Sequence, residues 1–157
     1  MKTLITSASL TVLVAAQANA EWAHGVGTDP MTDQVVAVAT VRYTDGSYIR
    51  YRCEADGSQS IGYSGGEFLP GVAMSSGDLR AAIVYRVDDH EPQRRVWHVR
   101  NGTDGAYVDR VSLESTIADF LSARERILVQ DALETNEFDA SNAAEEITAV
   151  RTACGLD

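Results

Sequence analysis

The sequence predicts an α+β fold: an antiparallel β-sandwich or bent sheet, two helices in the C-terminal half, and one disulfide. Three observations predict it. Short runs of alternating apolar and polar residues, separated by Asp-Gly and Asn-Gly turns, fill the first two thirds of the chain. Apolar residues recur at helical spacing in the last third. The 157 residues include two cysteines, enough for a single bridge.

The first twenty residues have the features of a secretory signal peptide. A positive start at Lys2 precedes an apolar run over residues 4–16, and Ala18-Asn19-Ala20 offers small residues where a signal peptidase cuts. The apolar run is too short to span a bilayer. We therefore expect cleavage after Ala20, a single α+β domain over residues 21–157, and a periplasmic protein without a membrane span.

Five strands are predicted from the alternation. The Asp45-Gly46 and Asp56-Gly57 turns separate the first three, and the polar stretch 88–93 joins the last two. The segment from Trp22 to Asp33 is predicted as an irregular entry to the sheet. The expected strands are 35–43, 48–54, 60–63, 80–87 and 94–100.

The C-terminal part changes period. Ser112 is expected to cap a helix with one apolar stripe, and a further strand is expected over 127–133, followed by a polar turn over 134–137. The last helix runs to Cys154, and Gly155 ends it. The stripe of the first helix consists of Leu113, Ile117, Phe120 and Leu121.

A disulfide between Cys53 and Cys154 is expected in an oxidising compartment. Cys53 shares a strand face with Tyr51, and Cys154 continues a helical stripe through Ile147 and Val150, so each cysteine lies on the core side of its element. Closing a loop of about a hundred residues is worth roughly 4 to 5 kcal/mol on the chain-entropy model. The alternative, a redox or metal-binding thiol pair, lacks a C-x-x-C spacing.

The charge balance excludes one class of partner. The chain has 13 basic and 23 acidic residues, for a formal net charge of -10. Binding to nucleic acid needs clustered positive charge, so we expect no nucleic-acid partner. Lys2 is the only lysine, so every basic residue beyond the leader is an arginine.

An arginine-rich sheet face is the least expected constellation. If the strands alternate as predicted, five arginines lie opposite the apolar side, and Arg94 and Arg100 join them. Cross-strand pairing with acidic neighbours is the simpler interpretation. The alternative is a partner-binding surface for wall carboxylates, lipid phosphates or an acidic protein. The five residues are Arg42, Arg50, Arg52, Arg80 and Arg86.

Motifs for catalysis or cofactor binding are missing from the sequence. It contains no G-x-S-x-G, no phosphate-binding loop and no dinucleotide fingerprint, so we expect no catalytic residue and no cofactor. The best candidates for metal ligands are Asp88, Asp89 and His90, because carboxylates beside an imidazole suit a divalent metal. They also fall where a hairpin turn is required, and a solvated turn is the preferred interpretation.

The order of several short motifs resembles a known family. The series begins with Trp22, and it includes Trp97, which follows the motif that ends at Asp88. The other motifs are Asp29-Pro30-Met31-Thr32-Asp33, Arg52-Cys53, Tyr85-Arg86-Val87-Asp88, Phe138-Asp139 and Cys154-Gly155. Together they resemble the VasI-like (TagO-like) exported accessory proteins of type VI secretion clusters. The resemblance implies a periplasmic, non-catalytic protein with a small β-rich fold.

These observations lead to one expected function and two alternatives. The expected function is a non-enzymatic periplasmic accessory or binding module, associated with type VI secretion or the cell envelope, that contacts an envelope protein or a cell-wall component. An inhibitor of a lysozyme-type enzyme is the first alternative, because a negative surface steers onto a basic enzyme. A metal-dependent hydrolase centred on Asp88, Asp89 and His90 is the second.

Overall fold

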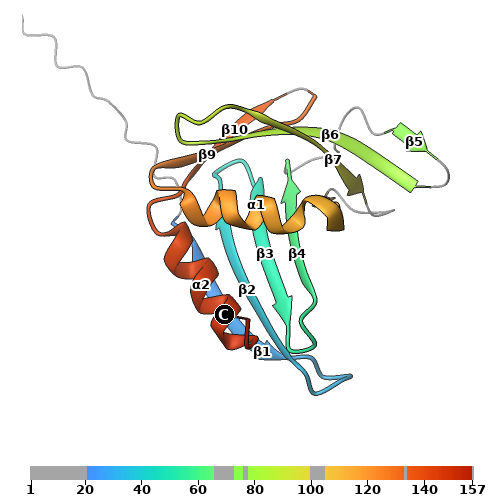
Figure 1. The fold of residues 1–157 in the computed structure, drawn as a ribbon, viewed down its shortest axis with the longest axis vertical. Coiled ribbons are helices and arrows are strands. Elements are labelled where there is room, and N and C mark those ends of the chain that lie inside the picture. Colours follow the sequence, from blue (N-terminus) through green and yellow to red (C-terminus); the bar gives the residue numbers. More distant parts are fainter. Residues whose placement is uncertain (1–20, 66–72, 76–77, 100–104, 133, 157) are drawn as a thin grey trace, which may run out of the picture.

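The strands form one antiparallel sheet that bends around two helices. The computed structural model describes residues 21–65, 73–75, 78–99, 105–132 and 134–156. Figure 1 shows β2, β3 and β4 side by side along one axis, β6, β7, β9 and β10 crossing above them, and both helices packed on one side of the sheet. All strands in these ranges belong to a single sheet, so the predicted antiparallel sheet is confirmed and a sandwich of two sheets is not what the structure shows.

The strands follow in the spatial order β1-β2-β3-β4-β8-β7-β6-β9-β10, with β5 paired to β6. Neighbouring strands are antiparallel throughout. Their bounds are β1 Ala23–Thr28, β2 Val35–Arg42, β3 Tyr48–Glu54, β4 Gln59–Ser64, β5 Ala73–Ser75, β6 Asp78–Val87, β7 Gln93–Val99, β8 Gly105–Val108, β9 Arg126–Gln130 and β10 Thr135–Asp139.

Two segments that the sequence predicted as irregular are strands. The expected entry segment Trp22 to Asp33 contains β1, and the expected turn over 134–137 lies largely within β10. In β1 every residue is exposed, so no alternation marks it in the sequence. In β10 the inward residues are Asn136 and Phe138, and Asn136 does not read as a core residue.

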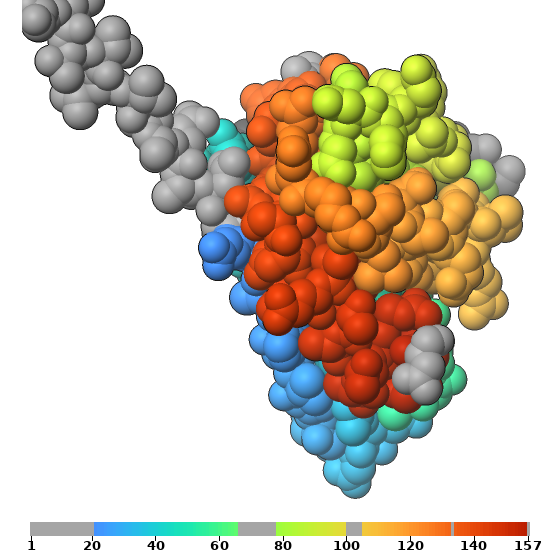
Figure 2. Space-filling model, turned by 60° about the vertical axis from the view of Figure 1, so that its left-hand side comes forward, coloured from blue at the N-terminus to red at the C-terminus, as the bar shows by residue number. Residues whose placement is uncertain are grey.

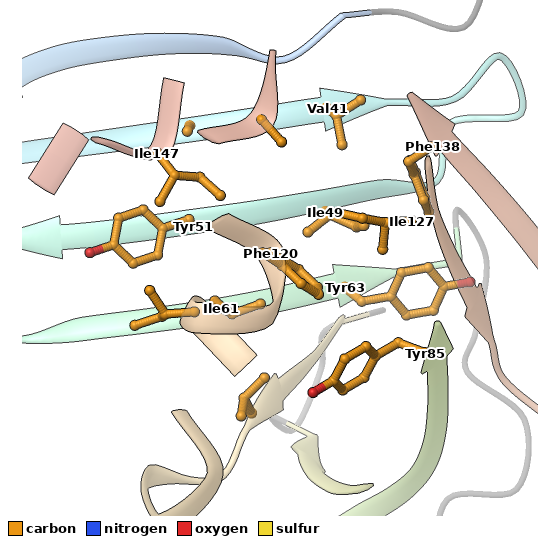
Figure 3. Packing of buried hydrophobic residues seen from close by; sticks show 14 of the residues in the cluster. Val41, Ile49, Tyr51, Ile61, Tyr63, Tyr85, Phe120, Ile127, Phe138 and Ile147 are labelled. Carbon is orange, nitrogen blue, oxygen red and sulfur yellow. The ribbon is translucent and has the colours of Figure 1, made fainter. Parts of the chain in front are cut away.

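The inner face of the sheet, which faces the helices, carries the core. Strand alternation turns Ile49, Tyr51 and Cys53 of β3 inward, and each is fully buried. Figure 3 shows Ile49 and Tyr51 among side chains of the helices, such as Phe120, and of the strands on the far side of the bend, such as Ile127. Aromatic rings pack edge to face across this bend, with centroids 6.3 Å apart for Tyr63 of β4 and Phe138 of β10.

The two helices are α1, Arg110–Ser122, and α2, Ala143–Ala153. The predicted cap of α1 is wrong by three residues: Asp109 caps the helix, its side chain accepting a hydrogen bond from the Val111 N–H, and Ser112 lies inside the first turn. The predicted end of α2 is confirmed. Cys154 is its C-cap, and Gly155 follows with φ of 72°, a conformation that favours glycine.

The predicted disulfide is present. Cys53 of β3 and Cys154 at the end of α2 are bonded, 101 residues apart in sequence. Figure 1 shows α2 beside β1 and β2, so the bond ties the C-terminal helix to the inner face of the sheet. Among the residues described, no helix has the length and hydropathy needed to cross a membrane. The expected leader lies outside the described residues.

Candidate functional site

The outer face is the side of the sheet turned away from the helices. All five arginines singled out from the sequence lie on it, because each alternates with buried neighbours along its strand. Arg94 of β7 is exposed on the same face, and Arg100 lies outside the described residues. The five are Arg42 of β2, Arg50 and Arg52 of β3, and Arg80 and Arg86 of β6.

The arginines do not form one patch. Register pairs connect Arg50 to Gly62, Gly62 to Tyr107, Tyr107 to His98, and His98 to Arg80. Each step is one strand spacing, so Arg50 and Arg80 are about 19 Å apart along the sheet. The outer face therefore has an arginine group at β2 and β3 and a separate one at β6.

The first group is built around an aromatic ring. The guanidinium carbon of Arg42 lies 5.3 Å from the ring centre of Tyr48, and that of Arg50 lies 5.0 Å from it. Tyr48 faces Arg42 across the β2–β3 hairpin and precedes Arg50 by two residues on β3. We call this arrangement the Arg42–Tyr48–Arg50 cluster. Cation–π contacts of this kind fix the orientation of a guanidinium group.

This cluster carries unbalanced charge. Within the part of the chain that the structure describes, neither Arg42 nor Arg50 forms an ion pair with a carboxylate. The Nε atom of Arg50 is shielded from solvent and has no hydrogen-bond partner among the described residues. Two adjacent guanidinium groups are therefore held in place without a carboxylate partner from the described part of the chain.

The other three arginines are at least partly neutralised. Their carboxylate partners come from the same strand or the next turn, and not from the facing strand as the sequence suggested. The ion pairs are Arg52 with Glu54 at 2.9 Å, Arg80 with Asp78 at 3.8 Å, and Arg86 with Asp89 at 3.5 Å, with Arg126 joining Asp89 at 3.0 Å.

A hollow of about 310 Å³ lies beside the cluster on the outer face. Tyr107, which lines the hollow, lies against Gly62: a Cβ atom at Gly62 would lie 2.9 Å from Cε1 of Tyr107, so the tyrosine ring rests on bare backbone. Arg50 contributes to both the cluster and the hollow. The hollow is lined by Arg50, Arg52 and Glu54 of β3, by Ser58, Gln59 and Ser60, and by Tyr107 of β8.

Gln59 connects the wall of this hollow to the interior. Its Oε1 accepts hydrogen bonds from the Tyr51 hydroxyl at 2.6 Å and from Arg151 at 3.1 Å, and its Nε2 donates to Glu114 at 3.3 Å. Burial raises the pKa of Tyr51 above its usual value, so the hydroxyl keeps the proton that it donates. The wall is thus held by contacts to both helices.

Asp88 is a structural residue. Its carboxylate accepts three backbone N–H bonds, from Arg124, Glu125 and Arg126, at 2.9 to 3.0 Å. Burial by itself would raise the pKa of Asp88, but these three hydrogen bonds outweigh it and lower the pKa. His90 forms no hydrogen bond to Asp88 in this arrangement; instead its backbone N–H closes the turn onto Val87.

The metal-hydrolase alternative gains no support from this geometry. Asp89 is committed to Arg86 and Arg126, as Asp88 is to the backbone. Across the described ranges, no three His, Cys, Asp or Glu side chains gather closely enough to hold a metal ion. The lysozyme-inhibitor alternative rests on the net charge of -10.

Sequence reasoning missed Tyr48, Gly62 and Tyr107. The Asp45-Gly46 hairpin carries a usable signal, because its register places Tyr48 opposite Arg42. Tyr107 lies on β8, a four-residue strand that was not predicted, so its contact with Gly62 had no signal.

No protein-family model, curated protein or solved structure matches this chain. The resemblance to VasI-like proteins therefore stays a prediction.

Proposed function

We propose that this chain is a non-enzymatic, exported binding module that recognises an anionic envelope component through its outer face. The contact is the Arg42–Tyr48–Arg50 cluster together with the adjoining hollow. One observation carries the proposal: in a chain with 23 acidic and 13 basic residues, two neighbouring guanidinium groups have no acidic partner in the described residues. Because acidic residues outnumber basic ones in this chain, the lack of a partner for these two arginines does not come from a shortage of carboxylates.

The chemistry of the guanidinium group favours a carboxylate or phosphate ligand. Its planar fork forms two parallel, charge-assisted hydrogen bonds with such groups. Stacking on Tyr48 holds both guanidinium groups before a ligand arrives, which lowers the conformational entropy lost on binding.

The overall negative charge limits the binding to a local contact. Long-range attraction cannot bring an anion to a chain of net charge -10, so selectivity depends on the short-range geometry of the cluster. Added salt first screens this long-range repulsion, and it screens the contact itself only as the Debye length falls to about 3 Å near 1 M salt. We therefore expect binding to weaken at high salt.

The compartment is part of the proposal. A disulfide and the lack of a membrane-crossing helix among the described residues are compatible with an extracytoplasmic protein. Export through the predicted leader would deliver the chain to the periplasm, where wall carboxylates and envelope proteins are available. An accessory role in type VI secretion rests on the sequence resemblance alone.

Co-sedimentation with purified peptidoglycan sacculi, together with a pull-down from periplasmic extract, tests the proposal. Charge reversal at the cluster, Arg42→Glu with Arg50→Glu, should reduce retention more than tenfold, since two charge-assisted contacts are lost. The matched control is Arg94→Glu with Arg124→Glu, which changes net charge equally at two exposed positions away from the cluster. The control should bind nearly as well as the unmodified chain.

Two outcomes would contradict the proposal. One is equal retention of the cluster variant and the control. The other is no retention of the unmodified chain on either envelope fraction at low salt.

A further inference from the structure

The sheet ends in an edge strand that lacks the usual protection. All six residues of β1 are exposed, and they include no carboxylate and no proline. Its register with β2 is continuous from Ala23 to Thr28. Proteins normally blunt exposed edges with charges, prolines, bulges or short strands. By contrast, the opposite edge, β10, carries Glu137 and Asp139, and β5 has three residues.

The pairing of β1 with β2 fixes which backbone groups face outward. Directly beyond β1, the Asp29 N–H donates to the Gln34 carbonyl at 2.9 Å, in the same register as the strand pair. Backbone groups of an antiparallel strand alternate between its two sides. Counting back from Asp29, the backbone groups of His24, Val26 and Thr28 therefore point to the open edge.

We propose that β1 pairs with β1 of a second copy of this chain, antiparallel, about a two-fold axis at Val26. The three outward-facing residues are symmetric about Val26, so this register sets Val26 opposite the partner's Val26 and His24 opposite the partner's Thr28. Each of these pairs exchanges both N–H···O bonds, and no outward-facing group of β1 is left over. A register centred on Gly25 would leave Thr28 unpaired.

The side chains fit this register. Val26 is 57% exposed, and the pairing places two such valines side by side, a favourable cross-strand pair. On the other side of the strand, a Cβ atom at Gly25 or Gly27 would meet nothing within 4 Å, so the approach of a second strand is open there. Figure 2 shows the blue β1 segment along the margin of the molecule, beside the red α2.

Charge favours a second copy as the occupant. Two chains of net charge -10 repel each other over most of their surfaces, but β1 itself carries no acid, and the carboxylate of Glu146 beside it is hydrogen-bonded to His24 at 2.6 Å. A two-fold axis perpendicular to the sheet continues the sheet through both copies and keeps both outer faces on the same side. The dimer would therefore display two Arg42–Tyr48–Arg50 clusters on one surface.

Sedimentation equilibrium of the exported, leader-free chain tests the dimer. A strand pair buries less than the roughly 800 Å² per partner of a standard interface, so we expect a weak dimer with a dissociation constant in the micromolar range. The measured mass should rise from one copy towards two between low-micromolar and near-millimolar concentrations.

Two variants make the test specific to the edge. Val26→Pro removes an N–H that points to the open side and leaves the β1–β2 ladder intact, so it should give monomers with an unchanged melting temperature. Val26→Glu places like charges opposite each other and should act in the same way. Val111→Glu adds the same charge at an α1 residue that is 93% exposed, and it should not alter the dimer.

A chain that stays monomeric over the whole concentration range would overturn the proposal. So would dimers of both Val26 variants that match the unmodified chain, because they would place the contact elsewhere.

Discussion

The inner and outer faces of β3 differ although their residues alternate along one strand. Ile49, Tyr51 and Cys53 face inward and are fully enclosed by the helices and the bend of the sheet. Arg50 and Arg52 face outward between them, at the hollow on the outer face. Neighbouring residues of one strand thus serve stability on one face and, in our proposal, recognition on the other. Substitutions at alternate positions should separate these two properties.

Two buried tyrosine hydroxyls of the inner face are hydrogen-bonded to side chains. Inside, the Tyr63 hydroxyl accepts a hydrogen bond from Asn136 at 2.8 Å and donates one to Asp131 at 3.2 Å. The Tyr85 hydroxyl donates to Asp119 at 2.7 Å, and burial raises its pKa to about 12. Outside, the shielded Nε atoms of Arg50, Arg80, Arg86 and Arg126 all lack a partner among the described residues. Arg50 differs from the other three because none of its guanidinium nitrogens pairs with a carboxylate in the described ranges.

Removing the disulfide should have the largest effect, and only on the inner face. Cys53→Ala with Cys154→Ala releases a loop of 101 residues, which we expect to lower the unfolding free energy by roughly 4 to 5 kcal/mol. Urea unfolding measures this loss. Below the new melting temperature, sacculus binding should persist, because the cluster lies on the other face. A stability loss under about 1 kcal/mol would contradict this account of the bond.

A smaller loss should follow from Tyr63→Phe. The change leaves the Asn136 amide, which is 5% exposed, without its acceptor, and such a buried donor costs about 1 to 3 kcal/mol. Tyr48→Phe is the matched outer-face control, because it keeps the ring between Arg42 and Arg50. Its effect should stay within about 0.5 kcal/mol. Equal losses at both positions would remove the distinction between the faces.

Asp88→Asn should cost about 1 kcal/mol near neutral pH, as the loss of a side-chain cap does. The pKa of Asp88 is lowered in the folded state, so the carboxylate contributes stability above the usual Asp range. That contribution is lost as pH falls below about 4. Unfolding measured between neutral pH and pH 3 should show this acid step in the unmodified chain and a weaker step in the variant. If the unfolding free energies of the unmodified chain and the variant changed with pH in the same way, the stabilising role given to the Asp88 carboxylate would be contradicted.

The smallest change in stability is expected from Gly62→Ala. The added Cβ would lie 2.9 Å from the Tyr107 ring, so the ring must move, while alanine restores some backbone rigidity. We expect a net effect below about 1 kcal/mol. Sacculus binding should nevertheless weaken, because the hollow changes shape. Gly105→Ala, where the added Cβ would make an ordinary 3.6 Å contact with the same ring, is the control, and equal binding by both variants would show that the hollow takes no part.

The alternation of apolar and polar residues predicted the strands that have one buried and one exposed side. It did not predict β1, whose two sides are both exposed. Val35–Arg42 and Tyr48–Glu54 each have a buried side, so their pattern and the outward direction of their arginines follow from the sequence. Ala23–Thr28 is exposed on both sides and left no pattern. The cysteine pair followed from two independent periodicities that both point to the core.

The charge state of each arginine was beyond sequence reasoning. Whether Arg86 is neutralised depends on the turn that brings Asp89 to 3.5 Å, and Arg50 is set apart by the absence of such a turn beside it in the described residues. Ion pairs of this kind depend on rotamers and loop geometry, which no residue pattern encodes. The sequence therefore predicted that the arginines lie on the outer face of the sheet, but it did not predict which of them lack a carboxylate partner.

The central claim is that the Arg42–Tyr48–Arg50 cluster is the part of the outer face that binds anions. The most direct test is an NMR titration that follows the arginine side-chain Nε–Hε signals while a carboxylate polymer, polyglutamate, is added at low salt. We predict that the Arg42 and Arg50 signals shift with saturable, salt-sensitive curves. The signals of Arg86 and Arg126 should stay in place, because the Nη2 atom of each already pairs with Asp89 and neutralises the guanidinium group. Equal shifts at all four arginines, or none at Arg42 and Arg50, would contradict the claim.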